Sequence, residues 1–397
     1  MHEKSDAIVF VGMTYPHGNV RHFALLGCEL YKVVENSADF FYASIQDEVN
    51  PGSWSIVRNT IPSNRIICTS TFNELAEFSV KLARKYTRVI IHTGGGWSQT
   101  KGFVSARKQL GKELSRRVSF VATTHSYRNN TIFRMPVSIV QFVLYRLFYA
   151  AVIFQCKYAA DRFVGGKWLI RHGRAFVAPL GCESFDDVPD PVPAGISDKL
   201  ELVNSLKDKS LFKFVYLAVL RQGKMHAWLV DAIAPVLQHN PNVRLLLCGS
   251  WHEKVYREVL KRIKEFSLEG QILVPGPIPR NEVPWLLKHS NCAVVPSRSE
   301  TFGHNFLEPM FAGLPVIGTR VGIGCDIINN GVTGYAFCLN DVRSFREAAN
   351  KVIANIAETE HMGQRARALV VDRFTHNAVA KQIVSVYNRI RGLHCHK

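Results

Sequence analysis

The stretch SRSETFGHNFLEPMFAGLPVI, residues 297–317, decides how the rest of the sequence is organised. A short apolar run at residues 292–296 precedes it, and another at residues 315–317 ends it; both are typical of buried strands. Between the two runs the chain must turn at a glycine and enter a short helix. The stretch therefore predicts a strand, a turn, a helix and a second strand in close succession.

The helix start predicted within this stretch suits an anion. Asn305 followed three residues later by Glu308 has the form of a capping box, and Pro309 then fits the first helical turn. A helix N-terminus directs N–H groups and the positive end of the helix dipole toward the space beside the strand, which favours a phosphate. Glu300 on the loop and Glu308 at the helix start flank that space, and both can accept hydrogen bonds from sugar hydroxyls.

Glu300 and Glu308, separated by seven residues and followed by a Gly-Leu-Pro-Val-Ile run, resemble the E-x7-E signature of retaining glycosyltransferases of family 4. The resemblance implies a GT-B fold, in which two doubly wound Rossmann-like α/β domains face each other across a cleft. It implies that Glu300 contacts the donor sugar and that Glu308 contacts the ribose of the nucleotide. The residues between them are then expected to bind the donor: Gly303, His304, Asn305, Phe306 and Leu307.

Length and pattern agree with two domains. A chain of 397 residues that is 47% hydrophobic can bury two cores, and strand and helix signals alternate in both halves. A run rich in Pro and Asp at residues 186–195 marks the linker. The expected parts are a first domain at 1–185, a linker at 186–210, a nucleotide-sugar domain at 211–374 and a final helix at 375–397 that crosses back to the first domain.

The cysteines and the charge indicate the cellular compartment and the kind of partner. The nine cysteines are scattered without a Cys-x-x-Cys pair, which argues for a reducing compartment, and the opening residues do not form a signal peptide. We expect a cytoplasmic protein. The net charge of +17 is concentrated at residues 81–174, where eighteen Lys and Arg face only Glu113 and Asp161. Such an excess suits an anionic membrane surface or an acidic substrate, and no nucleic-acid-binding module accompanies it.

Two segments of this basic region carry the membrane hypothesis. Residues 97–117 combine an apolar stripe with a strongly basic face, so they form either an interfacial helix or a basic face packed on the core. Residues 132–156 are the longest apolar stretch, but Arg134, Gln141 and Arg146 interrupt it. That stretch is predicted to be a buried or membrane-surface helix rather than a transmembrane one.

The first half offers two site candidates. Gly18 lies in a turn between an apolar strand at residues 7–12 and a helix, where it either brings backbone N–H groups to the donor or forms an ordinary turn. His125 ends an apolar strand that begins at Val118, and the resemblance places a histidine at this strand end beside the donor. No role is assigned to residues 36–64.

The second half offers cations for a diphosphate. Arg221 and Lys224 follow the strand at residues 214–219 on a glycine-containing loop, and two cations there would neutralise a diphosphate. Lys224 matches a lysine of the resembled family, although Met225 replaces the glycine that usually follows. Gly276 and Ile278 resemble the segment that holds the base. The resemblance implies no metal, and we expect no cofactor besides the nucleotide-sugar substrate.

The sequence thus predicts a retaining hexosyltransferase-type enzyme that moves a sugar from a nucleoside diphosphate to an acceptor hydroxyl in glycolipid, lipopolysaccharide or surface polysaccharide synthesis. Glu300 orients the donor, His125 is the first-domain candidate, and the leaving phosphate helps take the acceptor proton on the same face of the sugar. The alternative is a non-catalytic nucleotide-sugar-binding or membrane-associated scaffold protein of the same fold.

Overall fold

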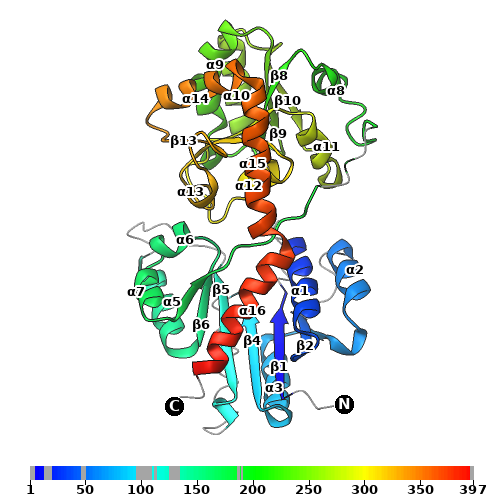
Figure 1. Ribbon diagram of the computed structural model, residues 1–397, viewed down its shortest axis with the longest axis vertical. Helices are drawn as coiled ribbons and strands as arrows, with labels where there is room; N and C mark the ends of the chain where they lie inside the picture. The colour runs from blue at the N-terminus through cyan, green and yellow to red at the C-terminus, as the bar shows by residue number, and fades with distance from the viewer. Residues whose placement is uncertain are drawn as a thin grey trace. The chain divides into compact units, whose positions relative to one another are not determined.

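The computed structural model divides into two compact units, which are described separately (Figure 1). Unit 1 comprises Met1–Gly181 and Phe374–Lys397, and unit 2 comprises Cys182–Arg373. The structure describes residues 5–12, 20–45, 51–94, 110, 114–124, 135–185, 188 and 191–393.

The described part of unit 1 contains a sheet of seven parallel strands in the order β3-β2-β1-β4-β5-β6-β7. All residues of the central strands β1 and β5 are buried, as expected for a parallel sheet covered on both faces. The strands are β1 (Asp6–Val11), β2 (Asp39–Ile45), β3 (Ile66–Thr69), β4 (Arg88–Thr93), β5 (Val118–Thr124), β6 (Ala151–Phe154) and β7 (Ala175–Val177).

Helices cover this sheet, and the last helix of the chain is one of them. Helix α16 packs against α1, and the Tyr387 hydroxyl lies 2.6 Å from His92 Nδ1 at the end of β4. The helices are α1 (Val20–Val34), α2 (Pro51–Thr60), α3 (Phe72–Lys85), α5 (Met135–Phe148), α6 (Lys157–Arg162), α7 (Gly166–Arg171) and α16 (His376–Leu393), with a 3-10 turn η1 (Ser63–Arg65).

Local sequence explains where α3 begins. Thr71 is the N-cap, and its hydroxyl accepts a hydrogen bond of 3.2 Å from the Glu74 N–H, while the Glu74 carboxylate accepts one of 2.9 Å from the Ser70 N–H. These bonds satisfy N–H groups at the helix start.

Residues 36–64, to which the sequence assigned no role, contain β2 and α2. The aromatic residues that obscured the pattern are buried in the sheet: Phe40 is 2% exposed and Tyr42 is 6% exposed. A strand buried on both faces does not alternate between apolar and polar residues, so its signal is weak.

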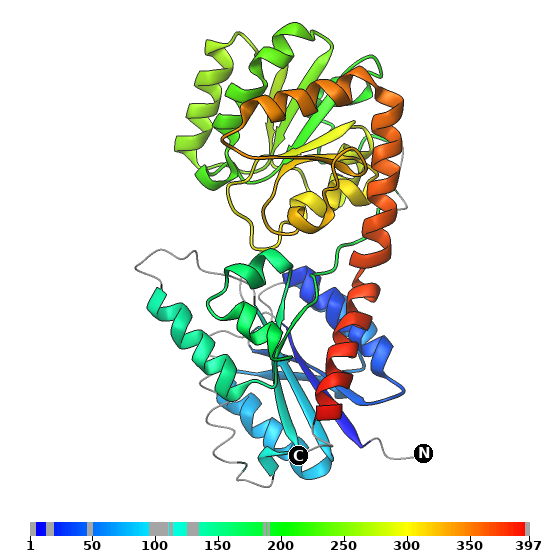
Figure 2. The same cartoon turned by 60° about the vertical axis from the view of Figure 1, so that its left-hand side comes forward.

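The long apolar stretch at residues 132–156 is a helix followed by a strand. Helix α5 ends at Phe148, and the buried strand β6 begins three residues later. Figure 2 shows α5 on the outside of unit 1, and four of its apolar side chains are exposed: Ile139, Val140, Val143 and Leu147. In the part of the chain that is described, no helix is long and apolar enough to cross a membrane. The expected helix at 97–117 lies largely outside the described residues.

Unit 2 repeats the plan with six described parallel strands in the order β10-β9-β8-β11-β12-β13. The expected α/β class with doubly wound parallel sheets is therefore confirmed. The strands are β8 (Phe212–Leu217), β9 (Val243–Cys248), β10 (Ile272–Gly276), β11 (Cys292–Val295), β12 (Val316–Thr319) and β13 (Gly334–Phe337).

The helices of unit 2 include one within the segment expected to be the linker, since α8 lies between residues 186 and 210. Helices α9 and α10 pack against each other. The helices are α8 (Leu200–Lys207), α9 (His226–His239), α10 (Glu253–Glu265), α11 (Val283–Lys288), α12 (His304–Phe311), α13 (Gly324–Ile327), α14 (Val342–Ala354) and α15 (Ile356–Phe374), with 3-10 turns η3 (Gln222–Lys224) and η4 (Arg280–Glu282).

Candidate active site

The strand order of unit 2 reverses between β8 and β11. The chain leaves β8 toward β9 and leaves β11 toward β12, so the loops after these two neighbouring strands diverge at the carboxyl edge of the sheet. Such a switch point is where open α/β sheets bind ligands. The loop after β8 carries Arg221 and Lys224, and the loop after β11 carries Glu300.

The two loops meet at the Glu300 carboxylate. Its Oε1 atom accepts hydrogen bonds from the Lys224 ammonium, from the Ser297 hydroxyl at 2.7 Å and from the Asn305 side-chain amide at 3.2 Å. Glu300 is only 9% exposed, so the ammonium partner compensates a carboxylate held largely away from water. Lys224 on the loop after β8 thus contacts Glu300 on the loop after β11.

Tyr216, near the end of β8, bonds to residues of both loops. Its hydroxyl donates a hydrogen bond of 2.9 Å to the Lys224 carbonyl and lies 3.1 Å from the Ser297 hydroxyl. Burial raises the pKa of Tyr216, so the hydroxyl stays protonated and keeps its donor. Sequence reasoning missed this residue because a tyrosine within an apolar strand is indistinguishable from a core residue.

Helix α12 begins differently from the prediction. Gly303 is the N-cap at φ 102°, no side chain caps the helix, and Pro309 is the sixth helical residue rather than a first-turn residue. The predicted capping box of Asn305 and Glu308 is therefore wrong. A Cβ on Gly303 would lie 2.8 Å from the Phe306 ring, so both the space and the left-handed backbone require glycine.

Because α12 starts at His304, the N–H groups of His304 and Asn305 lie outside the helical ladder at the carboxyl edge of the sheet. The His304 ring is half-buried and packs edge-on against Phe302 at 5.1 Å. Phe306 and Leu307 are fully buried, so only their backbones are available to a donor.

The loop that carries Glu300 is hydrogen-bonded to the turn after β12. The Ile323 N–H donates a hydrogen bond of 2.7 Å to the Phe302 carbonyl. A Cβ on Gly322 would lie 2.3 Å from that carbonyl oxygen and 2.8 Å from the Glu300 Cβ. The glycine thus lets two backbones approach closely and fixes the position of Glu300.

Glu308 is buried, at 6% exposed, and forms an ion pair with Arg280 from the loop after β10. Burial raises the pKa of the Glu308 carboxyl, and the Arg280 guanidinium opposes the shift. The second arm of Arg280 lies 3.9 Å from Glu183. Sequence reasoning missed Arg280. Its only signal was its position four residues after Gly276.

The remaining donor candidates occupy neighbouring loops of unit 2. Arg221 is exposed at the N-terminal side of η3, and the described residues contribute no ion pair to it. Gly276 ends β10, and its carbonyl accepts a hydrogen bond of 2.9 Å from the Gly249 N–H. Ile278 is half-buried in the following loop. Gly18 and His125 lie outside the described residues.

Comparison with known proteins matches a large part of unit 2. Residues 198–369 match the sequence profile of the family described as glycosyl transferases group 1. This stretch is therefore similar to the group 1 glycosyltransferases. The matched stretch lies within unit 2 and includes Lys224, Arg280, Glu300 and Glu308.

Named relatives resemble the chain over part of their length. N-acetyl-alpha-D-glucosaminyl L-malate synthase of Bacillus anthracis is 29% identical over 173 residues, which cover 44% of each chain. Alpha-1,3/1,6-mannosyltransferase ALG2 of Dictyostelium discoideum is 29% identical over 134 residues, 34% of this chain and 32% of the relative. The chain thus matches about a third to a half of the length of these relatives.

Solved structures extend the fold comparison over the whole chain. Anabaena Alr3699/HepE, solved in complex with UDP, has a TM-score of 0.71 at 18% identity and covers 97% of this chain and 100% of its own. A glycosyltransferase from Rickettsia africae has a TM-score of 0.73 at 17% identity, covering 98% and 99%. With the two parallel sheets, these likenesses confirm the GT-B fold class.

Proposed function

We propose that the protein is a retaining glycosyltransferase that moves a sugar from a nucleoside diphosphate to an acceptor hydroxyl. The observation that carries the proposal is the pair of buried carboxylates around the start of α12, Glu300 bonded to Lys224 and Glu308 bonded to Arg280. Both stand at the carboxyl edge of a parallel sheet, in a domain of the matching family.

Glu300 orients the donor sugar in this proposal. Three donors converge on its Oε1 atom and fix the plane of the carboxylate. A carboxylate offers about four lone-pair sites, so a sugar hydroxyl can bond to it while these partners stay in place. A fixed acceptor requires little reorganisation during the reaction, which is how such a residue contributes to catalysis.

The leaving diphosphate is met by positive charge. Lys224, Arg221 and the N–H groups at the start of α12 supply it, each charge-assisted contact contributing about 2 kcal/mol. The leaving phosphate then takes the acceptor proton on the same face of the sugar, so the anomeric configuration is retained. These cations make the proposed reaction metal-independent.

Glu308 binds the ribose in this proposal. Because its carboxylate is already paired with Arg280, the ribose hydroxyls must bond to the lone pairs that Arg280 leaves or displace the guanidinium. Arg280 is therefore part of the donor site in this proposal.

The proposed acceptor belongs to glycolipid, lipopolysaccharide or surface polysaccharide synthesis at the cytoplasmic face of a membrane. Four exposed apolar side chains on α5, within the basic region at residues 81–174, support contact with anionic lipid. Replacing Val143 and Leu147 by serine is expected to weaken binding to vesicles that contain anionic lipid. Unchanged vesicle binding would remove the membrane part of the proposal.

The donor test uses thermal stabilisation by UDP, GDP, ADP and CMP, with and without Mg²⁺, followed by transfer assays with the corresponding sugar nucleotide. Ligand at about a hundred times its Kd stabilises a protein by ~2.7 kcal/mol, which gives a clear shift in Tm. We expect one nucleotide to act without Mg²⁺ and NMR to show a product with the donor's anomeric configuration. Binding without turnover, unchanged by Glu300→Gln, would instead identify a nucleotide-sugar-binding protein.

A further inference from the structure

A second pocket lies at the N-terminus of helix α9. Its volume is about 310 Å³, a size that suits a small molecule. The first turn of α9 and Met225 form one wall, and α10 forms another. The Lys224 side chain, which points to Glu300, is not among the lining residues.

This helix start carries positive potential without a capping group. Met225 is the N-cap at φ 61°, no side chain caps the helix, and no acidic residue lies in its first turn. The first N–H that bonds back to the N-cap is that of Leu229, so the N–H groups of His226, Ala227 and Trp228 have no backbone partner among the described residues. An uncapped helix N-terminus of this length attracts an anion.

His226 is the second, independent sign of a ligand. Its side chain is 1% exposed and lines the pocket, yet neither ring nitrogen has a hydrogen-bond partner in the described structure. Burial, and secondarily the charge of Lys224, lowers the pKa of His226 to about 3, so the ring is neutral and offers one donor and one acceptor. Buried polar atoms are normally hydrogen-bonded, so these two ring nitrogens are suited to bond a polar atom of a ligand.

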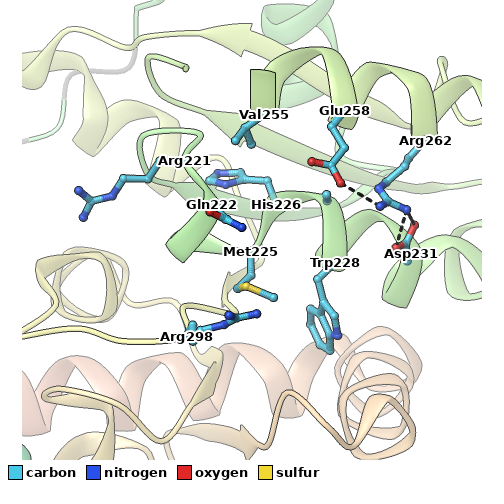
Figure 3. Close-up of a pocket in the computed structure, with 11 residues that line it drawn as sticks. Arg221, Gln222, Met225, His226, Trp228, Asp231, Val255, Glu258, Arg262 and Arg298 are labelled. Atoms are coloured by element: carbon cyan, nitrogen blue, oxygen red, sulfur yellow. Dashed lines mark hydrogen bonds and ion pairs between the residues drawn. The ribbon is translucent and has the colours of Figure 1, made fainter. Parts of the chain in front are cut away.

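The rest of the lining indicates what the ligand looks like. Figure 3 shows Arg298 next to Met225 and near Trp228, while Arg221 extends away from the other side chains. Arg262 is already paired with Asp231 and Glu258. Two other cations line the pocket without an ion pair among the described residues, Arg298 and Arg221, and Arg298 is the one that lies next to Met225. The apolar lining of Met225, Ala227, Trp228 and Val255 suits a flat hydrophobic group.

We propose that this pocket binds a small molecule that combines an anionic group, phosphate or carboxylate, with a flat apolar part. The anion is held by Arg298 and the N–H groups at the start of α9, His226 bonds to a polar atom of the ligand, and the apolar part lies against Trp228 and Met225. The inference does not rest on the proposed transferase activity. Among the described residues proposed for the donor, Arg221 also lines this pocket, whereas Glu300 and Lys224 do not.

The pocket is physically linked to the Glu300 site. The His226 ring stacks on Tyr216 with 4.7 Å between ring centroids, and the Tyr216 hydroxyl bonds to the Lys224 carbonyl. Lys224 also directly precedes Met225, the N-cap of α9. A ligand that orders the start of α9 therefore acts on the backbone that carries the Lys224 ammonium.

The test uses phenyl phosphate as the probe and ³¹P NMR of the full chain as the readout, with and without saturating UDP. We expect saturable binding with a Kd on the order of 1 mM, which is usual for a ligand of this size. Inorganic phosphate should bind more weakly because it lacks the apolar part. UDP should not displace the probe, since Arg298 and the start of α9 hold it; the Lys224 side chain and Glu300 are outside the pocket, and Arg221 extends away from the other lining side chains.

Two variants locate the binding. Arg298→Ala removes the cation and Ala227→Leu fills the pocket without changing charge; each should weaken binding of phenyl phosphate about tenfold or more. Arg343→Ala, at a site that is 89% exposed on α14, is the charge-matched control and should bind normally. The affinity for phenyl phosphate is compared only among variants whose Tm equals that of the parent.

The proposal is overturned if phenyl phosphate shows no saturable binding up to about 10 mM, ten times the expected Kd. It is also overturned if both pocket variants bind like the parent, or if UDP displaces the probe competitively. A failure of every nucleotide to bind would instead count against the proposed transferase function and leave the Arg298 dependence of phenyl phosphate binding as a separate result.

Discussion

Replacing His226 by phenylalanine should change how the stability of unit 2 depends on pH. Phenylalanine keeps a flat ring to stack on Tyr216 and removes the two buried nitrogens that lack partners. The imidazole has an ordinary pKa of 6.5 in the unfolded chain and a pKa of about 3 in the folded one, because burial disfavours its charged form. Below pH 6.5 the unfolded state therefore binds more protons than the folded state, so stability falls as the pH falls toward 3.

The magnitude follows from the two pKa values. At pH 5 the unfolded histidine is protonated while the folded one is still neutral, and the gap of ~1.5 units corresponds to about 2 kcal/mol. At pH 7 the same group contributes almost nothing to the difference. The parent protein should thus lose about 2 kcal/mol between pH 7 and pH 5 through this residue alone, and His226→Phe should remove that part of the decline.

Amide hydrogen exchange of β8 (Phe212–Leu217) is the appropriate assay, because it reports the opening free energy of unit 2 separately from unit 1. His239→Phe on the same helix is the control, since His239 is exposed and should leave the pH dependence as it is. If His226→Phe and the parent lose the same free energy of unfolding between pH 7 and pH 5, the imidazole is not kept neutral by burial. His226 would then no longer be evidence for a ligand in the pocket at α9.

Three further changes test the candidate active site. Glu300→Gln should lower kcat/KM for sugar transfer by about 100-fold and should also lower the Tm, because the neutral amide leaves the Lys224 ammonium without its carboxylate. Arg280→Ala should cost about 3 kcal/mol in urea unfolding, since it leaves the Glu308 carboxylate buried without its cation, and adding Glu308→Gln should restore most of the loss. Gly303→Ala should cost about 2 kcal/mol, because a left-handed backbone and the Phe306 ring both oppose a Cβ.

Each expectation has an outcome that contradicts it. Full activity of Glu300→Gln beside an equally active Glu265→Gln control would remove Glu300 from the donor site. Equal stability of the single Arg280→Ala and double variants would show that the pair is not coupled. A Gly303→Ala protein with the parent's Tm would mean that the start of α12 adopts a right-handed backbone.

Local patterns were sufficient wherever an element depends on its own residues. The strand that contains Tyr216 and the strand, turn and helix around Glu300 were predicted from runs of apolar residues and glycines. Strand β2 was missed because its residues are buried on both faces and do not alternate. The start of α12 was misplaced because Asn305 and Glu308 have the spacing of a capping box, whereas the left-handed Gly303 ends the loop one residue before the helix.

The sequence by itself predicted the α/β class from strand and helix signals that alternate in both halves, and short motifs singled out Glu300, Glu308 and Lys224. Only the tertiary structure decided the partners that come from other strands. Arg280 reaches Glu308 from 28 positions away, Tyr216 joins two loops, and His226 lines a pocket with Arg298. The physical reason is that a parallel sheet brings the carboxyl ends of strands distant in sequence to one edge, and no local pattern records which side chains meet there.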